Sequence, residues 1–331
     1  MFRTILVPLD GSRLAEEALP TAVATARRTG ATLQLAMVHH PVMPSADSAA
    51  MTSAFTELDR LAHEGEKRYL ASVAERIRGE SDLVVHTAIL EGAVGERLAA
   101  HATSLPADLV VMTTHGRGAV SRMWLGSVAD ELLRHLTMPL LLLRHRAPEP
   151  AYGRSGFRRI LIPLDGSARS EAILEPALAI CPPLGAHYSL LRVVIPPPAL
   201  AEPAVAARGG EPSDVIEGER RQAAAYLDRI ADRLEARGCH VSTQVIVGDA
   251  PARVIIEQGN PAVTDCIALA TRGAAGMTRL LLGSVTDKVV RGAEVPVLAL
   301  HPPQSEDEST HASVAAQSAE GLSREGVAIG G

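Results

Sequence analysis

The sequence has few aromatic residues and no excess of positive charge. Aromatic residues make up 2% of the 331 residues, which argues against the base-stacking surfaces of proteins that bind single-stranded nucleic acid. The formal net charge at pH 7 is -6, and no long basic run occurs. A phosphodiester backbone therefore has no broad basic surface to bind, and we expect no nucleic-acid partner.

Cysteine is also scarce, and long apolar runs are absent. The chain has three cysteines, Cys181, Cys239 and Cys266, without CxxC spacing. Their odd number gives no disulfide framework and predicts buried thiols in a reducing compartment. No apolar stretch approaches the ~20 residues that cross a bilayer, and the N-terminus leads into a strand pattern rather than a signal sequence. We therefore expect a cytoplasmic protein without a membrane partner.

The chain is rich in aliphatic residues, and it contains a long internal repeat. The segment ILVPLDGS at residues 5–12 returns as ILIPLDGS at residues 160–167, which indicates one domain type duplicated in tandem. A chain of 331 residues suits two units of roughly 150 residues each. We expect a first domain over residues 1–146, a linker over 147–156, a second domain over 157–302 and a disordered tail over 303–331.

Apolar runs and helical patterns alternate in both halves. The expected strands cover residues 4–9, 33–38, 83–90, 109–112 and 139–143, then 159–164, 188–193, 241–247, 266–269 and 296–300. Helical patterns lie between them, for example at residues 52–78 and 128–136. Alternation of this kind with apolar strands predicts a parallel sheet that helices cover on both faces.

A glycine-punctuated loop occurs once in each half. The first copy reads THGRGAVSRMWLGS at residues 114–127, and the second reads TRGAAGMTRLLLGS at residues 271–284. In both copies nine residues separate the first glycine from the Gly-Ser pair. Each loop follows an apolar run and precedes a helical pattern, and the free N–H groups of a helix N-terminus favour phosphate. A plain Gly-Ser helix cap is the alternative for one copy, but the shared spacing favours phosphate.

Charged residues lie beside these loops. Asp10 and Asp165 follow the first strand of their half. A carboxylate there can accept hydrogen bonds from ribose hydroxyls, or it can bond to the backbone of its own Asp-Gly turn. Arg117, Arg122 and Arg279 lie inside the loops and could contact phosphate or pair with surface carboxylates. Because the first loop has more polar side chains, we expect the first half to bind nucleotide at least as tightly as the second.

Motifs of other chemistries are missing. The sequence has no HxxxH, HExxH, GxSxG or GxxxxGK[ST] pattern, and no GxGxxG follows either first strand. The scattered histidines, such as His39 and His301, predict no metal site. No set of acid and base residues converges beside the loops, so we assign no catalytic residue.

These motifs together resemble the universal stress protein family in its tandem two-domain form. The family pattern is Gly-x2-Gly-x9-Gly-Ser/Thr, and both loops fit it except that Thr113 and Ala270 replace its first glycine. The segments VPLDGS (residues 7–12) and THGRG (residues 114–118) also look like the family. The resemblance covers residues 4–300. It implies two Rossmann-like domains of the adenine nucleotide alpha hydrolase-like class, each an α/β fold with a five-stranded parallel sheet of order 3-2-1-4-5.

The resemblance also implies ATP, with or without Mg2+ on its phosphates, in a crevice at the carboxyl ends of the strands. In the first half the implied cofactor-binding residues are Pro8, Leu9, Asp10, Val38, Met112, Thr113, Gly116, Arg117, Gly126, Ser127 and Val128. In the second half they are Pro163, Leu164, Asp165, Val193, Leu269, Ala270, Gly273, Gly283, Ser284 and Val285. By position, Asp10 would hold the ribose and Val38 would offer backbone groups to adenine.

The leading hypothesis from the sequence is an ATP-binding regulatory module of the stress response. A slow ATP-hydrolysing enzyme and a nucleotide-free structural adaptor are the alternatives. The apolar segments at residues 138–143 and 295–300 are candidate sheet edges, and exposed apolar edges invite pairing. Members of the family commonly dimerise there. We therefore expect an intramolecular pseudo-dimer through the fifth strands, and the same edges allow a homodimer.

Overall fold

A computed structural model describes residues 1–41, 52–114, 125–144, 156–181, 185–196, 212–271 and 283–302. Within each glycine loop, residues 115–124 and 272–282 lie outside these ranges. Gly116, Arg117 and Gly273 therefore lie outside the described residues, as do the expected tail and nearly all of the expected linker.

Strands and helices alternate through the described chain. The first half contains β1 (Thr4–Pro8), α1 (Arg13–Glu16), α2 (Ala18–Thr29), β2 (Thr32–His39), α3 (Thr52–Glu80), β3 (Val85–Glu91), α4 (Val94–Ser104), β4 (Leu109–Thr113), α5 (Ser127–His135) and β5 (Leu140–Leu143). The second contains β6 (Arg159–Pro163), α7 (Ala168–Glu171), α8 (Leu174–Ile180), β7 (His187–Val194), α10 (Pro212–Glu235), β8 (His240–Val247), α11 (Pro251–Gln258), β9 (Cys266–Ala270), α12 (Ser284–Gly292) and β10 (Val297–Leu300). The expected α/β class is confirmed.

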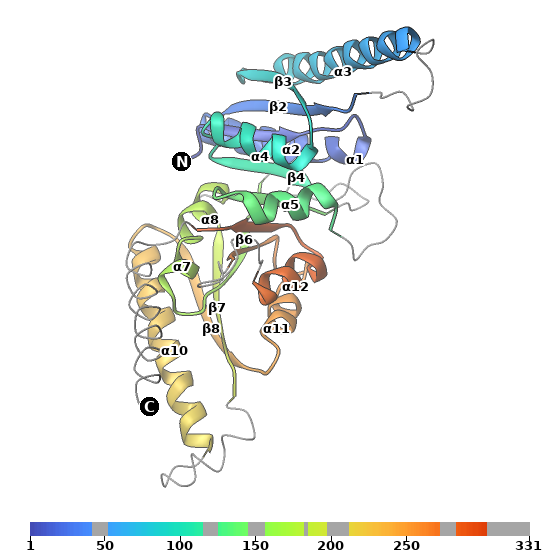
Figure 1. The fold of residues 1–331 in the computed structure, drawn as a ribbon. Helices are drawn as coiled ribbons and strands as arrows, with labels where there is room; N and C mark the ends of the chain where they lie inside the picture. Colours follow the sequence, from blue (N-terminus) through green and yellow to red (C-terminus); the bar gives the residue numbers. More distant parts are fainter. Residues whose placement is uncertain are drawn as a thin grey trace, which may run out of the picture.

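The strands form one ten-stranded sheet of order β3-β2-β1-β4-β5-β10-β9-β6-β7-β8 (Figure 1). Each half on its own has the order 3-2-1-4-5, and its strands pair in parallel. The two halves meet at β5 and β10, which pair antiparallel with Leu141 opposite Leu298. The sheet is thus continuous across the chain rather than divided into two separate sheets.

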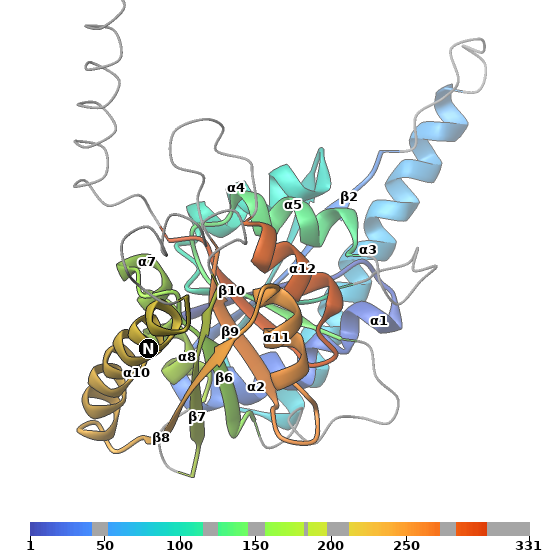
Figure 2. The same ribbon diagram turned by 90° about the horizontal axis from the view of Figure 1, so that it is seen from below.

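Helices cover both faces of this sheet (Figures 1 and 2). One buried cluster lies between the sheet and α2, α3, α8 and α10, and the other lies under α4, α5, α11 and α12. Successive strand residues alternate between the clusters, as the pleat requires: Ile5 and Val7 belong to the first cluster, and Leu6 belongs to the second. Inner strands such as β4 and β9 are therefore apolar on both faces, which explains the continuous apolar runs of the sequence, whereas the outer strands β3 and β8 carry exposed polar residues.

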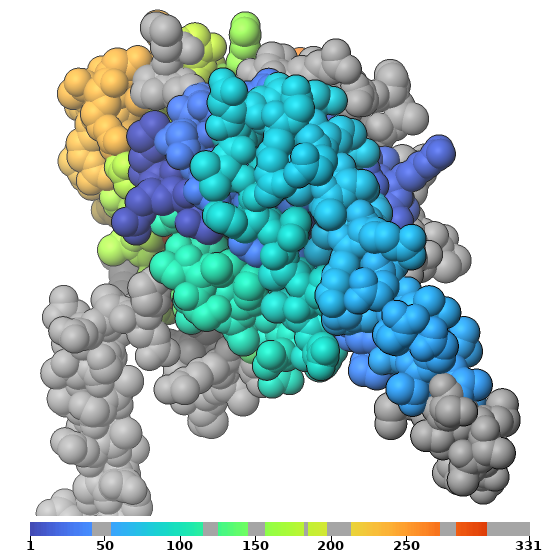
Figure 3. Space-filling view, turned by 90° about the horizontal axis from the view of Figure 1, so that it is seen from above, coloured from blue at the N-terminus to red at the C-terminus, as the bar shows by residue number. Residues whose placement is uncertain are grey.

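The long helix α3 extends beyond the strands that it covers. Its C-terminal part buries Leu70 and Val73, whereas Leu58 and Leu61 nearer its start are 54% and 48% exposed. Figure 3 shows the first part of α3 projecting from the body of the protein. Within the described ranges, neither α3 nor any other helix has the length and apolar character that crossing a bilayer requires.

All three cysteines are buried as free thiols. Burial raises the pKa of Cys181 to about 12, and it also raises the pKa values of Cys239 and Cys266. The thiolate is the reactive form of cysteine, so these side chains stay protonated and inert at neutral pH. They contribute to the core as small apolar groups.

An aspartate before the fourth strand of each half holds the beginning of the first strand. Asp108 Oδ2 accepts the backbone N–H groups of Arg3 at 2.7 Å and Thr4 at 2.9 Å. Asp265 Oδ2 accepts the N–H groups of residues 158 and 159, both at 3.0 Å. The same pair of backbone-to-carboxylate hydrogen bonds therefore fixes the alignment of β1 with β4 and of β6 with β9.

Replacing Asp265 should destabilise the protein. The Arg159 side chain also pairs with Asp265, whose side chain is 18% exposed, at 2.6 Å. Asp265→Ala leaves two backbone N–H groups without their acceptor and removes the carboxylate partner of Arg159, whose guanidinium keeps its bonds to the carbonyls of Pro261 and Ala262. We expect a loss of about 2–3 kcal/mol in unfolding free energy. Urea denaturation followed by circular dichroism measures it, with Asp82→Ala at an exposed position as the control. Equal midpoints for the two variants would contradict this role.

Candidate functional site

A cavity of about 1080 Å³ opens at the carboxyl ends of the second-half strands. Its volume suits a ligand of nucleotide size. Nine of the cofactor-binding residues that the family resemblance implies for this half line the cavity: Pro163, Leu164, Asp165, Val193, Leu269, Ala270, Gly283, Ser284 and Val285. The structure thus brings together every implied second-half residue that it describes.

The topology explains why the cavity lies there. β6 and β9 are adjacent parallel strands, with Ile160 opposite Cys266. The chain leaves β6 for α7 and α8, and α8 packs on one face of the sheet, whereas it leaves β9 for α12 on the other face. Strand ends that diverge in this way leave a crevice, which is where ligands bind in open α/β sheets.

A tight turn after β6 forms one wall of the cavity. Asp165 Oδ1 accepts the backbone N–H of Ser167 at 3.0 Å and its hydroxyl at 2.5 Å. Ser167 in turn caps α7, because its Oγ accepts the Ser170 N–H at 3.1 Å. The first half repeats the turn, where Asp10 Oδ1 accepts the Ser12 N–H at 2.9 Å. Both aspartates thus make the local turn bond that the sequence left open as an alternative to a ribose contact.

Arg192 lies against this turn. Its Nη1 donates to the Leu164 carbonyl at 3.4 Å. Gly166 has a φ of +85°, and a Cβ placed there would lie 3.7 Å from the same nitrogen. Glycine therefore allows the turn its left-handed backbone, and Arg192 and Asp165 both line the cavity.

The N-terminus of α12 forms the facing wall. Gly283 caps the helix with φ -59° and ψ 136°, without a side-chain cap. The first intrahelical bond runs from the Asp287 N–H to the Gly283 carbonyl at 2.9 Å. By position, the N–H groups of the three residues 284–286 have no acceptor within the helix, and all three residues line the cavity. This end of the helix therefore favours an anion.

The first half places its implied residues at the same edge of the sheet. Pro8, Leu9, Asp10, Val38, Met112, Thr113, Gly126, Ser127 and Val128 lie at or just beyond the carboxyl ends of β1, β2 and β4 or at the start of α5. Gly126 caps α5 with φ -59° and ψ 148°. Its own N–H donates to the Thr114 carbonyl at 2.8 Å, so the fold already uses this donor and a ligand would meet the N–H groups that follow it.

The two halves differ in charge at equivalent positions. Three cations, Arg192, Arg253 and Lys288, line the second-half cavity together with the carboxylates of Asp165, Glu219 and Asp249. Strand register and helix starts align the three cations with Met37, Glu96 and Glu131 of the first half. The Glu131 side chain packs on Gly95, where an added Cβ would overlap it. The second crevice is thus better suited to a polyanion than the first.

Comparison with known proteins identifies the family. The model of the Universal stress protein family matches the chain twice, at residues 1–144 and at residues 156–301. The chain belongs to the universal stress protein family. Two matches in one chain, together with the repeated fold, make it a tandem two-domain member, as the sequence predicted.

Several relatives share this organisation or one half of it. A universal stress protein of Mycobacterium tuberculosis is 26% identical over 313 residues, which cover 91% of this chain and 95% of the relative. One of Methanocaldococcus jannaschii is 30% identical over 154 residues, covering 46% of this chain and 88% of the relative. The crystal structure of a universal stress protein from Archaeoglobus fulgidus superposes with a TM-score of 0.64 at 17% identity, covering 91% and 98% of the two chains.

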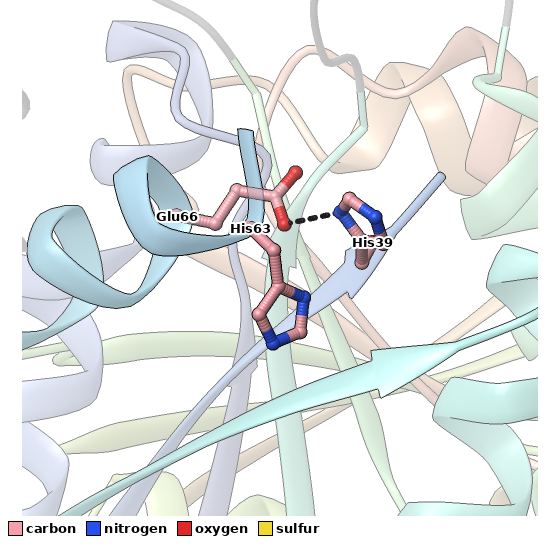
Figure 4. Close-up of side chains that lie close together, drawn as sticks. All are labelled: His39, His63 and Glu66. Carbon is pink, nitrogen blue, oxygen red and sulfur yellow. Dashed lines mark hydrogen bonds and ion pairs between the residues drawn. The ribbon is translucent and has the colours of Figure 1, made fainter. Parts of the chain in front are cut away.

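A buried histidine distinguishes the first universal stress protein domain from the second. His39 ends β2, and its Nδ1 lies 2.8 Å from Glu66 Oε2 (Figure 4). Its Nε2 lies 3.1 Å from Asp59 Oδ1. Burial alone would lower the pKa of His39, but the hydrogen bonds and charges of Glu66 and Asp59 outweigh it and raise that pKa. The ring of His63 meets that of His39 edge-on, with centroids 4.9 Å apart.

The sequence missed this cluster because its members lie far apart along the chain. The search for paired histidines looked for HxxxH spacing, and none occurs. The structure instead brings a strand end to one face of α3, where Asp59, His63 and Glu66 follow each other at helical spacing. A signal did exist in the His-x-x-Glu pair at residues 63–66, because residues three apart share a helix face.

A histidine holds the chain where the second glycine loop begins. Thr271 donates its N–H to the Leu300 carbonyl at 2.7 Å, and its Oγ1 lies 2.7 Å from His301 Nδ1. Burial lowers the pKa of His301, and the charge of Arg169 lowers it further. The neutral imidazole is therefore the form that the fold favours.

Acid should weaken the fold through His301. Because the folded-state pKa lies below the ordinary value of about 6.5, the unfolded chain takes up this proton first as the pH falls. The contribution of His301 to the free energy of unfolding is complete above about pH 6.5 and decreases below it. Urea midpoints at pH 7.5 and 5.5 should therefore differ more in the natural protein than in His301→Asn. A larger difference in the variant would contradict the lowered pKa.

Proposed function

We propose that this universal stress protein binds ATP in the second-half cavity and acts as a nucleotide-responsive regulatory module of the stress response. The observation that carries the proposal is the cavity itself. An uncapped helix N-terminus, three cations and the implied residues of the glycine pattern line one space of about 1080 Å³. Such a cavity suits a ligand that carries several negative charges at one end and an apolar group at the other, and ATP is a ligand of this kind.

The cavity has a polar end and an apolar end. The start of α12 and Lys288 would meet the phosphates. Asp165, which already holds its own turn, would accept a ribose hydroxyl with its remaining lone pairs. Val193, Val194 and Ala223 give an apolar wall for adenine. Mg2+ would enter with the phosphates rather than on a protein cage.

We propose that the second half binds ATP more tightly, whereas the sequence led us to expect the first half to bind it at least as tightly. That expectation rested on the polar side chains within the glycine loops. In the described residues around the crevice, the second half has Arg192, Arg253 and Lys288. The first half has Met37, Glu96 and Glu131 at the equivalent positions. Carboxylates repel phosphate, so the first half should bind ATP more weakly.

The remaining expectations are part of the same proposal. The antiparallel pairing of β5 with β10 supports an intramolecular pseudo-dimer of two domains, at residues 1–146 and 157–302. A homodimer of the whole chain stays a prediction.

The buried free thiols favour a reducing compartment, and we propose the cytoplasm. Hydrolysis of ATP, if it occurs, should be slow, because no residue is assigned as an acid or base.

Gly283→Asp should weaken ATP binding strongly. The backbone at Gly283 suits an aspartate, which is a favoured N-cap residue, so the fold should survive. The new carboxylate would compete for the N–H groups of α12 and repel phosphate. We expect at least a tenfold loss of ATP affinity by isothermal titration calorimetry, which is about 1.4 kcal/mol. Gly126→Asp at the equivalent position is the matched control and should change that affinity little.

Three outcomes of this titration separate the hypotheses. Tight ATP binding that Gly126→Asp abolishes and Gly283→Asp spares would move the site to the first half. Binding that neither variant alters would place the nucleotide outside both glycine patterns. If the natural protein binds no ATP, the nucleotide-free structural adaptor becomes the better hypothesis.

Exchanging one charge should alter affinity more modestly. Lys288→Glu gives the second half the residue of the first. Because Lys288 is exposed, its ion pair with phosphate is screened, and we expect about a threefold loss of ATP affinity that added salt diminishes. Lys67→Glu, at an exposed position on α3 of the first half, makes the same change in net charge and is the control. An unchanged affinity would place the phosphates away from Lys288.

A further inference from the structure

The cluster around His39 has the composition of a metal site. His39 is buried, with a side chain that is 3% exposed, and His63 and Glu66 are partly buried. One ligand atom from each of these three residues lies within 4.8 Å of the others. Imidazole nitrogens and a carboxylate oxygen are ligands that zinc-type ions prefer. Figure 4 shows the Glu66 carboxylate turned toward the His39 ring, with the His63 ring lying beside them.

We propose that His39, His63 and Glu66 bind a divalent transition-metal ion of the zinc type in the first domain. The ion would take the place between His39 Nδ1 and Glu66 Oε2, with a nitrogen of His63 as the third ligand. Adjacent ligand atoms of a tetrahedral zinc site lie about 3.4 Å apart. The present separations need side-chain movements of about an ångström to reach that geometry, and His63 and Glu66 are only partly buried.

Asp59 completes the site from outside. Its Oδ1 lies 3.1 Å from His39 Nε2, the ring nitrogen that the ion would not use. Histidines that bind metals usually donate their other N–H to a carboxylate, which fixes the ring and raises the basicity of the ligating nitrogen. The three protein ligands leave a fourth position for water on the solvent side of the cluster.

The second domain has none of these groups at the equivalent positions. The repeated bonds of Tyr69 to Glu16 and of Tyr226 to Glu171 align α3 with α10. On this alignment the residues that correspond to His39, Asp59, His63 and Glu66 are Val194, Ile216, Arg220 and Ala223. Val194 and Ala223 line the second-half cavity. The positions at which the first domain has ligating side chains are thus positions at which the second domain has apolar residues that line its cavity.

This difference argues for a site rather than for a chance contact. A packed domain could fill the same space with apolar residues, as the second domain lines it with Val194 and Ala223. The first domain instead places a histidine between two carboxylates and sets a second histidine against its ring. Metal binding by the first domain does not depend on nucleotide binding by the second.

The test uses the full chain, freed of metal by a chelator and dialysed. Titration calorimetry with Zn2+ should show one saturable site per chain, and Co2+ should give the visible absorption bands of a tetrahedral site. His63→Gln and Glu66→Gln should each weaken Zn2+ binding at least about tenfold. Glu64→Gln, on the same helix outside the cluster, should bind like the natural protein.

Two further measurements keep the outcome clear. Thermal unfolding of each metal-free variant shows whether it folds, and Zn2+ should raise the melting temperature of the natural protein and of Glu64→Gln but not of His63→Gln. ATP affinity should be the same in all of them, which separates this proposal from the nucleotide site. The proposal would be overturned if the natural protein had no saturable site, or if His63→Gln and Glu66→Gln bound Zn2+ as tightly as the natural protein does.

Discussion

The parallel pairing of the first and fourth strands is the constraint on which both halves depend. It places β1 beside β4 and β6 beside β9, where the strand order reverses, and right-handed crossovers then take the chain from these neighbouring strand ends to opposite faces. The crevice and the placement of Asp165 beside the start of α12 follow from that divergence. Asp108 and Asp265 fix the opposite ends of the same strand pairs through backbone N–H groups. One pairing thus determines both the fold and the position of its site.

Duplication allowed the two crevices to diverge while the scaffold stayed the same. The turns at Asp10 and Asp165 share their bonds, and the tyrosine contacts of α3 and α10 repeat. The side chains above this scaffold do not repeat. The second crevice has Arg253 and Lys288 where the first half has Glu96 and Glu131, and the first half has the His39 cluster where the second has Val194 and Ala223. We therefore propose that one fold carries a polyanion site in one domain and a cation site in the other.

Much of the fold could be predicted from the sequence, because the repeat, the apolar runs and the glycine pattern are local signals. The expected strand at residues 83–90 appears as Val85–Glu91, and the others agree as closely. The charge difference between the crevices could not be seen, because Arg192 and Lys288 come from elements outside the loop motif. The cluster of His39 with Glu66 was missed for the same physical reason, since it joins a strand end to a helix.

Hydrogen exchange of the whole chain, with and without ATP, tests the central claim most directly. Amide protection reports where a ligand is bound, without any substitution. The account predicts that ATP slows exchange at the start of α12, at the turn after β6 and at the end of β7, and leaves the equivalent segments of the first half nearly unchanged. Protection confined to the start of α5 and the turn after β1, or no protection in either half, would contradict it.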